Sequence, residues 1–469
     1  MKELKFLKVL SSLNESDLQK FERFLDSPYC NSNKELRTLF THLRKSKFGN
    51  TLSETEKKAI WKKLYDTKPF VDSKWRRLCN EMLHQIFNFF TFESVNKEMA
   101  IKGNLLLKYI HKNNLGFLIS STIALVKKDF EKFKYQSSED HYHLFEFEKL
   151  VYDLMDYEVN MEKPSNLSAI HSELDLFYLS EKIKQIVTAQ SRLGFFNLQL
   201  DIKFESEIIE IIEKNKLLEY PEISIYYTIY NLRKNKFKYF EIKSELIADL
   251  SNASLIDALV INKEIINFCI LQLNDGQFQY AKEILDWYKL GLRKGWIFPD
   301  DKFNPGDFLN IVVSGIRTKE FTWTENFIDD YQKIIPKKSK RDIVTFSFAR
   351  LYFNQQKFGE VIEKLRDVEF DELTYNLDAK VLLLATYFEV EEWQALSSLA
   401  DSFRTFLHRH EKDITPSKKL RYSNFIKYTK KLSRVKYQDK KAKHKVLGEI
   451  QGLEGVVNQG WLIEKAKSI

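Results

Sequence analysis

The chain has 469 residues and a formal net charge of +8 at pH 7, and only 14 of its residues are Gly and 8 are Pro. A β-sandwich or barrel needs a turn residue at roughly every 8–12 positions, and a doubly wound α/β fold needs glycines at its phosphate-binding turns, so this composition excludes both classes. The 43% hydrophobic and 30% charged residues exclude a disordered chain, and the scarcity of Gly favours helices. We therefore expect an all-α protein.

Three helices are expected in the first 90 residues. Asn14 has the position of an N-cap residue before an acidic first turn, and Ser53 and Glu56 have the spacing of a capping box. Either Asp72 or Ser73 is expected to cap the third helix. The apolar face of this third helix has spacings of three and four residues and consists of Trp75, Leu78, Met82, Ile86 and Phe89.

Two of these helices, over 54–65 and 73–90, contain the segments Ile60-Trp61-Lys62-Lys63-Leu64-Tyr65 and Asp72-Ser73-Lys74-Trp75-Arg76-Arg77-Leu78. This helix pair resembles that of winged-helix bacterial transcription activators, some of which carry a tetratricopeptide-like domain. The resemblance implies that the second helix enters the major groove of DNA, with Lys74, Arg76 and Arg77 near the nucleic acid. The chain departs from that family because no β-hairpin wing is expected after Phe90. The alternative is a helical domain that caps the rest of the chain.

From about residue 246 the sequence has a repeating pattern. In each unit an aromatic residue follows a polar bend, a small or apolar residue comes three positions later, and another comes four positions beyond that. The aromatic residues of four successive units are 43, 37 and 35 residues apart, and they are Phe278, Phe321, Phe358 and Trp393. Gly occupies the bend only at Gly276, and the unit that ends at Pro299 and Pro305 carries an insertion.

This pattern resembles the tetratricopeptide repeat, a helix–turn–helix unit of about 34 residues. The resemblance covers roughly 250–410 and implies a right-handed superhelical array, in which each hairpin buries its apolar face against its neighbours. Weaker echoes at Lys236-Phe237 and at Asn114-Leu115-Gly116-Phe117 extend the helical hairpins back to about residue 96. The alternative is an irregular helical bundle whose spacings agree by chance.

The predicted domain organisation has four parts. An N-terminal helical domain over 1–95 is followed by irregular helical hairpins over 96–245. The tetratricopeptide-like repeats occupy 246–410, and a basic C-terminal helical segment occupies 411–469.

Charge is distributed unevenly, with a balance of +6 over 1–100, −8 over 101–400 and +10 over 401–469. In the C-terminal segment an apolar stripe of Phe425, Tyr428, Leu432 and Val435 predicts a final amphipathic helix, and Trp461 is expected to dock the terminus. The basic residues are either the solvated face of this capping helix or a binding surface for phosphate backbones or an acidic partner. The candidate polyanion-binding residues are Lys427, Lys430, Lys431, Arg434, Lys436, Lys440, Lys441, Lys443 and Lys445, together with Lys74, Arg76 and Arg77.

The sequence predicts no catalytic, cofactor-binding or metal-binding residue. The pairs His141/His143 and His408/His410 are two residues apart, so the two rings of each pair point to different sides of a helix, and the helix start at His141 is expected to be solvated. The HExxH, CxxC, GxGxxG, P-loop and GxSxG motifs do not occur, and Cys79 is expected to be a buried, inert thiol. A site assembled from distant residues would leave no such signal.

These observations favour a non-catalytic helical-repeat scaffold or adaptor that binds a protein or peptide partner in its concave groove. The alternative is a nucleic-acid-associated regulator that uses the basic helices at the two ends. The longest apolar run, 381–388, is too short for a membrane span, and the three cysteines indicate a reducing compartment. We therefore expect a cytoplasmic protein without a membrane partner, whose partner identity and oligomeric state the sequence leaves open.

Overall fold

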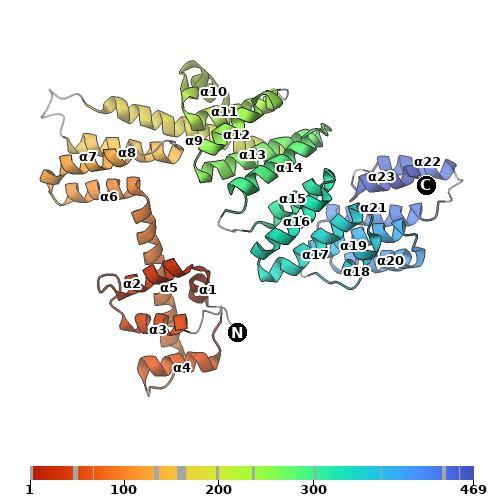
Figure 1. Ribbon diagram of the computed structural model, residues 1–469, viewed down its shortest axis with the longest axis horizontal. Coiled ribbons are helices and arrows are strands. Elements are labelled where there is room, and N and C mark those ends of the chain that lie inside the picture. Colours follow the sequence, from red (N-terminus) through yellow and green to blue (C-terminus); the bar gives the residue numbers. More distant parts are fainter. Residues whose placement is uncertain are drawn as a thin grey trace. The chain divides into compact units, whose positions relative to one another are not determined.

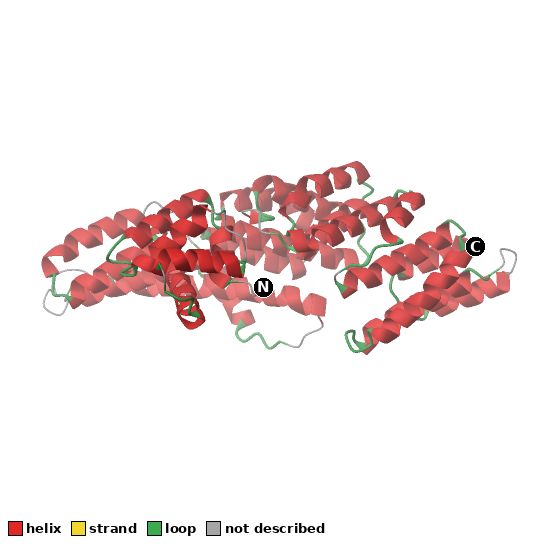
Figure 2. Cartoon of the chain, turned by 90° about the horizontal axis from the view of Figure 1, so that it is seen from below, coloured by secondary structure: helices red, strands yellow, loops and turns green. Residues whose placement is uncertain are grey.

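The computed structural model describes residues 4–45, 51–66, 68–130, 137–155, 165–196, 200–234, 238–299, 303–370, 372–435, 440–453 and 455–468. All regular secondary structure in these ranges is helical, which confirms the all-α fold (Figure 2). Many helices that follow one another in the chain pack against one another (Figure 1). Over the same ranges, no helix combines the length and the apolar composition that a membrane crossing requires.

The chain divides into two compact units, 1–182 and 183–469. The long helix α9 (Leu167–Phe196) contains this division, which does not coincide with the boundaries predicted after residues 95, 245 and 410.

The first helices of unit 1–182 share one apolar core, whose buried residues run from Phe6 to Phe89. All five residues of the predicted apolar face of the fifth helix are buried in it, as the spacing indicated. This helix continues to Lys97, so a helix, and no wing strand, follows Phe90. The elements are α1 (Lys5–Ser12), α2 (Glu15–Asp26), α3 (Lys34–Lys45), α4 (Glu54–Tyr65) and α5 (Asp72–Lys97).

Two of the three predicted helix starts are confirmed. The Asn14 side chain accepts a hydrogen bond from the Asp17 N–H at 2.9 Å, and Ser53 and Glu56 form the reciprocal capping box of α4. The expectation that Asp72 or Ser73 caps α5 is wrong. Val71 holds the N-cap position without a side-chain hydrogen bond, and Asp72 is already the first helical residue. Asp72 instead forms an ion pair at 2.5 Å with Arg76, which lies one turn later in α5.

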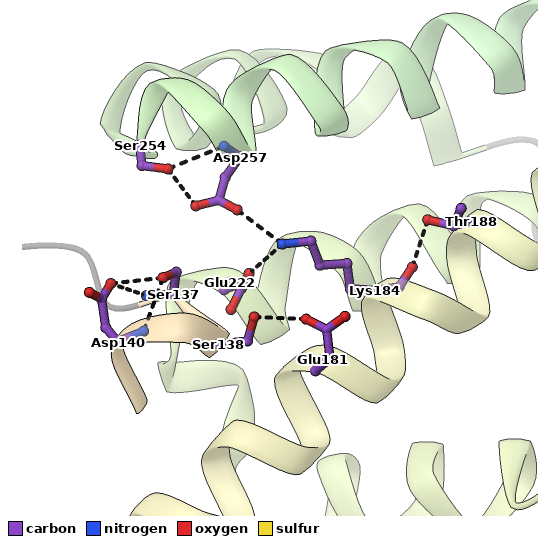
Figure 3. A network of polar contacts seen from close by, with 9 residues as sticks. All are labelled: Ser137, Ser138, Asp140, Glu181, Lys184, Thr188, Glu222, Ser254 and Asp257. Carbon is purple, nitrogen blue, oxygen red and sulfur yellow. Dashed lines mark hydrogen bonds and ion pairs between the residues drawn. The ribbon is translucent and has the colours of Figure 1, made fainter. Parts of the chain in front are cut away.

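The rest of unit 1–182 is a second, smaller cluster of helices. The buried residues Leu107, Phe130 and Phe147 join its members. These helices are α6 (Met99–Lys112), η1 (Gly116–Leu118), α7 (Ile119–Phe130), α8 (Ser138–Leu154) and the start of α9. Ser138 Oγ donates a hydrogen bond to Glu181 at 2.9 Å and so ties α8 to α9 (Figure 3).

Unit 183–469 begins with helices that enclose a buried polar network. Lys184 Nζ of α9 lies 3.4 Å from Glu222 Oε1 and 3.3 Å from Asp257 Oδ1, and these two acidic side chains are 1% and 4% exposed (Figure 3). Buried carboxylates are costly unless they are paired, so this network restricts how the three helices that contribute to it can pack. The elements are α10 (Glu205–Lys214), η2 (Leu217–Glu219), α11 (Pro221–Lys234), α12 (Tyr239–Asn252) and α13 (Leu255–Asn274).

A second polar layer joins the same helices α9, α11 and α13. Arg233 lies 3.3 Å from Glu264, and Ser191 is hydrogen-bonded to both of these side chains. Ser191 and Glu264 each lie seven residues after a residue of the first layer. Seven residues are about two helical turns, so the two layers are spaced along the helices.

Four consecutive helix pairs follow along the chain. The second helix in each pair packs against the first, and α15, α17 and α19 also pack in sequence. The pairs are α13 with α14 (Tyr280–Lys294), α15 (Pro305–Arg317) with α16 (Phe321–Tyr331), α17 (Lys337–Asn354) with α18 (Phe358–Leu365), and α19 (Leu373–Glu389) with α20 (Trp393–Arg409). A 3₁₀ turn, η5 (Gln332–Ile334), follows α16.

The bends inside these four pairs have the same backbone geometry. Each has a residue in the left-handed region, with φ of 87°, 60°, 60° and 58°, and these residues are Gly276, Lys319, Gln356 and Glu391. In each bend the next N–H donates to the carbonyl five residues earlier, for example Lys357 to Tyr352 at 2.9 Å. This hydrogen-bond pattern is the Schellman motif, which usually has Gly at the left-handed position. Three of the four bends adopt it without Gly.

The aromatic residue of each unit lies two positions after the left-handed residue, and it is exposed in two units and half-buried, as Phe321 and Phe358, in the other two. Phe278 is 78% exposed and Trp393 is 42% exposed, so neither is a core residue. The positions three and seven residues later are the buried ones, except that Ala281 is half-buried. At Gly315 a Cβ would lie 2.1 Å from Thr324 Oγ1, so Gly at that position lets α15 approach α16.

The last three helices share one core with α19 and α20, and this core continues across residues 410 and 411. Phe425, Tyr428 and Leu432 are buried in it, as predicted, and Trp461 and Leu462 dock the C-terminal helix. Trp461 Nε1 donates a hydrogen bond to Glu389 at 2.7 Å. The helices are α21 (Pro416–Leu432), α22 (Lys440–Gln451) and α23 (Gln459–Ser468).

Candidate functional site

A cavity of about 710 Å³ lies within unit 183–469, and we call it the groove cavity. The first helices of three pairs, α15, α17 and α19, contribute to its wall, and the C-terminal helix α23 closes one side. Apolar residues line part of the wall. They are Val313, Ile316, Phe346, Phe353, Phe358, Val381, Leu382, Val457 and Trp461.

Arg350 of α17 is the central cation of this wall. Its side chain is half-buried, and its guanidinium carbon lies 5.6 Å from the centre of the Phe346 ring. Burial lowers the pKa of Arg350, while the negative charge of Asp378 opposes that shift. Within the described ranges no carboxylate forms an ion pair with this guanidinium.

Asp378 of α19 is held by another residue. The Tyr422 hydroxyl donates a hydrogen bond to Asp378 Oδ1 at 2.6 Å, and Tyr422 itself is buried. This contact keeps the carboxylate on the α21 side of the cavity wall. The donor groups of Arg350 are therefore available to a ligand that enters the cavity.

The other charged residues of the wall differ in their pairing. Arg317 is exposed at the end of α15, where no described carboxylate pairs with it. Lys465 lies 2.8 Å from Glu389, which also accepts the Trp461 hydrogen bond, so this cation is neutralised inside the wall. Amide side chains complete the polar part of the lining, and they are Asn354, Gln356 and Asn458.

This arrangement suits a polypeptide segment. Amide side chains and guanidinium groups donate to backbone carbonyls and carboxylates, and the apolar wall accepts side chains. Half of the residues that line the groove cavity are apolar and half are polar or charged, so its wall is more polar than that of a typical small-molecule pocket.

The basic residues predicted at the C-terminus are only partly available. Lys430 forms an ion pair with Asp401 at 3.0 Å and Lys431 with Glu449 at 2.5 Å. Of the predicted residues on α21 and α22 and just after α21, Lys427, Arg434, Lys441 and Lys445 are exposed, while Lys443 is half-buried. Lys436 and the side chain of Lys440 lie outside the described residues, as does the echo at Lys236-Phe237.

The predicted basic residues of α5 lie in the other unit, 1–182. Lys74 lies 3.6 Å from Glu35 and also 3.6 Å from the centre of the Tyr65 ring. Arg76 pairs with Asp72, and Arg77 is exposed. Two of the three predicted DNA contacts are therefore engaged by neighbouring carboxylates.

The histidine and cysteine expectations have different outcomes. His141 is 1% exposed, and its Nδ1 lies 2.7 Å from Glu173 of α9, so the expectation of a solvated helix start is wrong. The prediction failed because α9 covers this side of α8, which local sequence does not reveal. Burial raises the pKa of the Cys79 thiol to about 12, which confirms the buried thiol. No cluster of three or more potential metal ligands occurs among the residues described.

Sequence reasoning missed Arg350 and Asp378. The signal available was a charged residue inside an otherwise apolar helical segment, since Arg350 lies between Phe346 and Phe353. That signal is weak because long cations commonly extend to solvent from such positions. Only the packing of α17 beside α19 brings the two residues to one cavity.

The chain matches no protein-family model, and neither the curated proteins nor the solved structures contain a match to it.

Proposed function

We propose that the chain is a non-catalytic helical-repeat scaffold or adaptor, which holds a protein or peptide segment in the groove cavity. As part of this proposal, the helix pairs from α13 to α20 are tetratricopeptide-like repeats. The support for repeats is the shared left-handed bend of the four pairs. The three described cysteines are all free, which agrees with a reducing, cytoplasmic location.

The observation that carries the proposal is the guanidinium of Arg350. A half-buried cation without an ion-pair partner is costly to the fold, and such a cost is retained where the group serves a ligand. Arg350 lies in the wall of a cavity that also offers amide donors and apolar surface. A segment with a carboxylate or backbone carbonyls facing Arg350 would supply the missing interaction.

Site-specific photocrosslinking tests this proposal. A benzoylphenylalanine at Asn354, which is exposed and lines the cavity, should crosslink a distinct partner in cell extract. The same group at Ser402, which is exposed on α20 and does not line the cavity, is the control. Arg350→Met should abolish the Asn354 crosslink. Identical products from both positions, or none from Asn354, would contradict the proposal.

The second candidate is a nucleic-acid-associated regulator, and the observation that favours it is the set of exposed cations on α21 and α22. Lys427 and Arg434 lie off the buried stripe, and Lys441 and Lys445 follow on the next helix. Such a surface would bind phosphate backbones with a strong dependence on salt. The ion pairs of Lys430 and Lys431 reduce the number of cations that remain for this purpose.

A further inference from the structure

The helical hairpin of α6, η1 and α7 in unit 1–182 has apolar residues on its solvent side (Figure 1). Leu105, Leu106 and Tyr109 of α6 are exposed, Tyr109 to 62%, and their spacings of three and four residues place them on one helix face. In η1, which packs against α6, Phe117 is 81% exposed. We call these four residues the hairpin surface. Exposed apolar residues that are grouped in this way mark an interaction site.

The hairpin surface is not needed for the packing of the hairpin itself. The other side of α6 contains Gly103, Leu107 and Ile110, which are buried. A Cβ at Gly103 would lie 2.8 Å from the side chain of Val126 of α7, so the core side of α6 is closely packed. A helix that is apolar on both sides is typical of one that is covered on both sides. We therefore expect a second contact on the solvent side of α6.

The charges around the hairpin surface indicate what covers it. Residues 99–128 contain five Lys and one His but no Asp or Glu, although 66 of the 469 residues of the chain are acidic. Lys102 lies three residues before Leu105, and Lys112 lies three residues after Tyr109, so both belong to the same side of α6. The occupant should therefore offer an apolar region next to negative charge.

Three of the five lysines are available to such an occupant. Lys108 and Lys127 form ion pairs with carboxylates of α8, at 3.4 and 3.8 Å. Lys102, Lys112 and Lys128 are exposed, and no carboxylate in the described ranges pairs with them.

An anionic lipid surface fits these features better than the other candidates. A second copy of the hairpin surface would bring lysines against lysines. Nucleic acid offers phosphates but no apolar region for exposed Leu, Tyr and Phe side chains. A protein partner has charges of both signs, so it would not require a contact region free of carboxylates. An anionic membrane is uniformly negative and disfavours every carboxylate, which accounts for the absence of Asp and Glu from 99–128.

We propose that the hairpin surface binds the interface of an anionic lipid membrane as a peripheral contact. Tyr109 and Phe117 enter the boundary between headgroups and acyl chains, and Lys102 and Lys112 extend to the headgroups. This inference goes beyond the proposed function, because it adds a second attachment surface in the unit that does not contain the groove cavity. The expectation of no membrane partner followed from the length of the longest apolar run, and a peripheral contact needs no spanning run.

Flotation of the full chain with lipid vesicles tests this proposal. The chain should float with vesicles of equimolar phosphatidylcholine and phosphatidylserine, and should remain largely unbound with pure phosphatidylcholine. Lys102→Gln combined with Lys112→Gln should lower the partition coefficient about 25-fold, because each lysine near an anionic surface contributes about fivefold. The control is Lys58→Gln combined with Lys62→Gln, which removes two exposed lysines of α4 and should change binding little.

The apolar contribution is measured with a matched pair of variants. Phe117→Ser should lower the partition coefficient by about tenfold or more, as expected when a buried Phe side chain is lost. Phe278→Ser removes an aromatic ring of nearly equal exposure from unit 183–469 and should have no effect. Equal losses in the two variants would overturn the proposal. Equal binding of the unaltered chain to both kinds of vesicle, or binding to neither, would overturn it as well.

Photocrosslinking separates a lipid surface from an acidic protein. Benzoylphenylalanine at Tyr109 should form an adduct with the mass of one phospholipid when the mixed vesicles are present. A protein adduct in cell extract, together with no flotation, would overturn the lipid surface and indicate an acidic protein partner. The Asn354 crosslink does not depend on the hairpin surface, so a failure of this inference is distinguishable from a failure of the proposed function.

Discussion

Arg350 and Asp378 line one cavity from adjacent helices, yet over the described part of the chain they form no ion pair, because Asp378 accepts the hydroxyl hydrogen bond of Tyr422 at 2.6 Å. We therefore expect Arg350 to affect ligand binding much more than the stability of the fold. A cation that has no partner in the fold contributes little to the fold, whereas a cation that serves a ligand is essential to binding.

The first prediction concerns Arg350→Met, which keeps the length of the side chain and removes its charge. The free energy of unfolding should stay within about 1 kcal/mol of the parent value, because no ion pair is lost and a desolvation cost is relieved. Urea denaturation measures this, and the crosslinking experiment measures the accompanying loss of partner binding. A loss of several kcal/mol would show that Arg350 is a structural residue.

The second prediction concerns the left-handed bends. Gln356→Gly and Glu391→Gly should each raise the free energy of unfolding by about 1 kcal/mol, since Gly adopts this conformation without the steric cost that other residues have. Gly276→Ala should lower the free energy of unfolding by a similar amount. Chemical denaturation of the three variants checks the sign of each change. Destabilisation by both substitutions to Gly would contradict the assigned geometry.

The third prediction concerns the docking of α23. Trp461→Ala should cost about 3–5 kcal/mol of stability because the ring fills the core shared with Phe388 and Phe425. Trp461→Phe removes mainly the hydrogen bond to Glu389 and should cost about 1 kcal/mol. Hydrogen exchange over 459–468 reports the local effect, with Lys467→Ala on the exposed face as the control. Unchanged exchange in Trp461→Ala would contradict the docking.

The fourth prediction concerns pH. The pKa of Cys79 is raised to about 12 by burial, from an ordinary value of 9.0, so the folded chain holds this proton after the unfolded chain has released it. The resulting stability is present below pH 9 and is lost as the pH rises from about 9 to about 12. Cys79→Ser should flatten this part of the stability profile. An alkylating agent at pH 8 should modify Cys30, which is half-buried, before Cys79 and Cys269, which are buried.

The fifth prediction separates the two functional candidates. If the C-terminal cations bind DNA, reversal of Lys427, Arg434, Lys441 and Lys445 to Glu should weaken binding. The slope of log affinity against log salt should then become less steep by about 0.9 for each lost phosphate contact. Reversal of Arg76 and Arg77 tests α5 independently. Unchanged DNA binding after the C-terminal reversal would exclude this surface.

The sequence predicted those features that depend on residues close together in the chain, such as helix caps and apolar helix faces. The Asn14 cap, the Ser53–Glu56 box and the apolar face of α5 follow from spacings within one helix, and the structure contains all three. The failures have a different origin. Asp72 satisfies the residue preference of an N-cap but is already helical, and His141 is polar but lies beneath α9.

The candidate site was inaccessible to sequence reasoning for the same physical reason. Arg350, Asp378 and Tyr422 belong to three helices, and their relationship exists only after those helices pack. The spacing of apolar residues predicts which face of a single helix is buried, whereas a cavity depends on how several helices pack together.

The two buried polar layers of α9, α11 and α13 have a consequence for folding fidelity. An apolar interface alone tolerates a slip of one helix by a turn, since one aliphatic side chain replaces another. Here such a slip would separate Lys184 from Glu222 and Asp257 and, at the same time, Arg233 from Glu264. Both layers can form only in one register of the three helices, so together they select that register over the shifted alternatives.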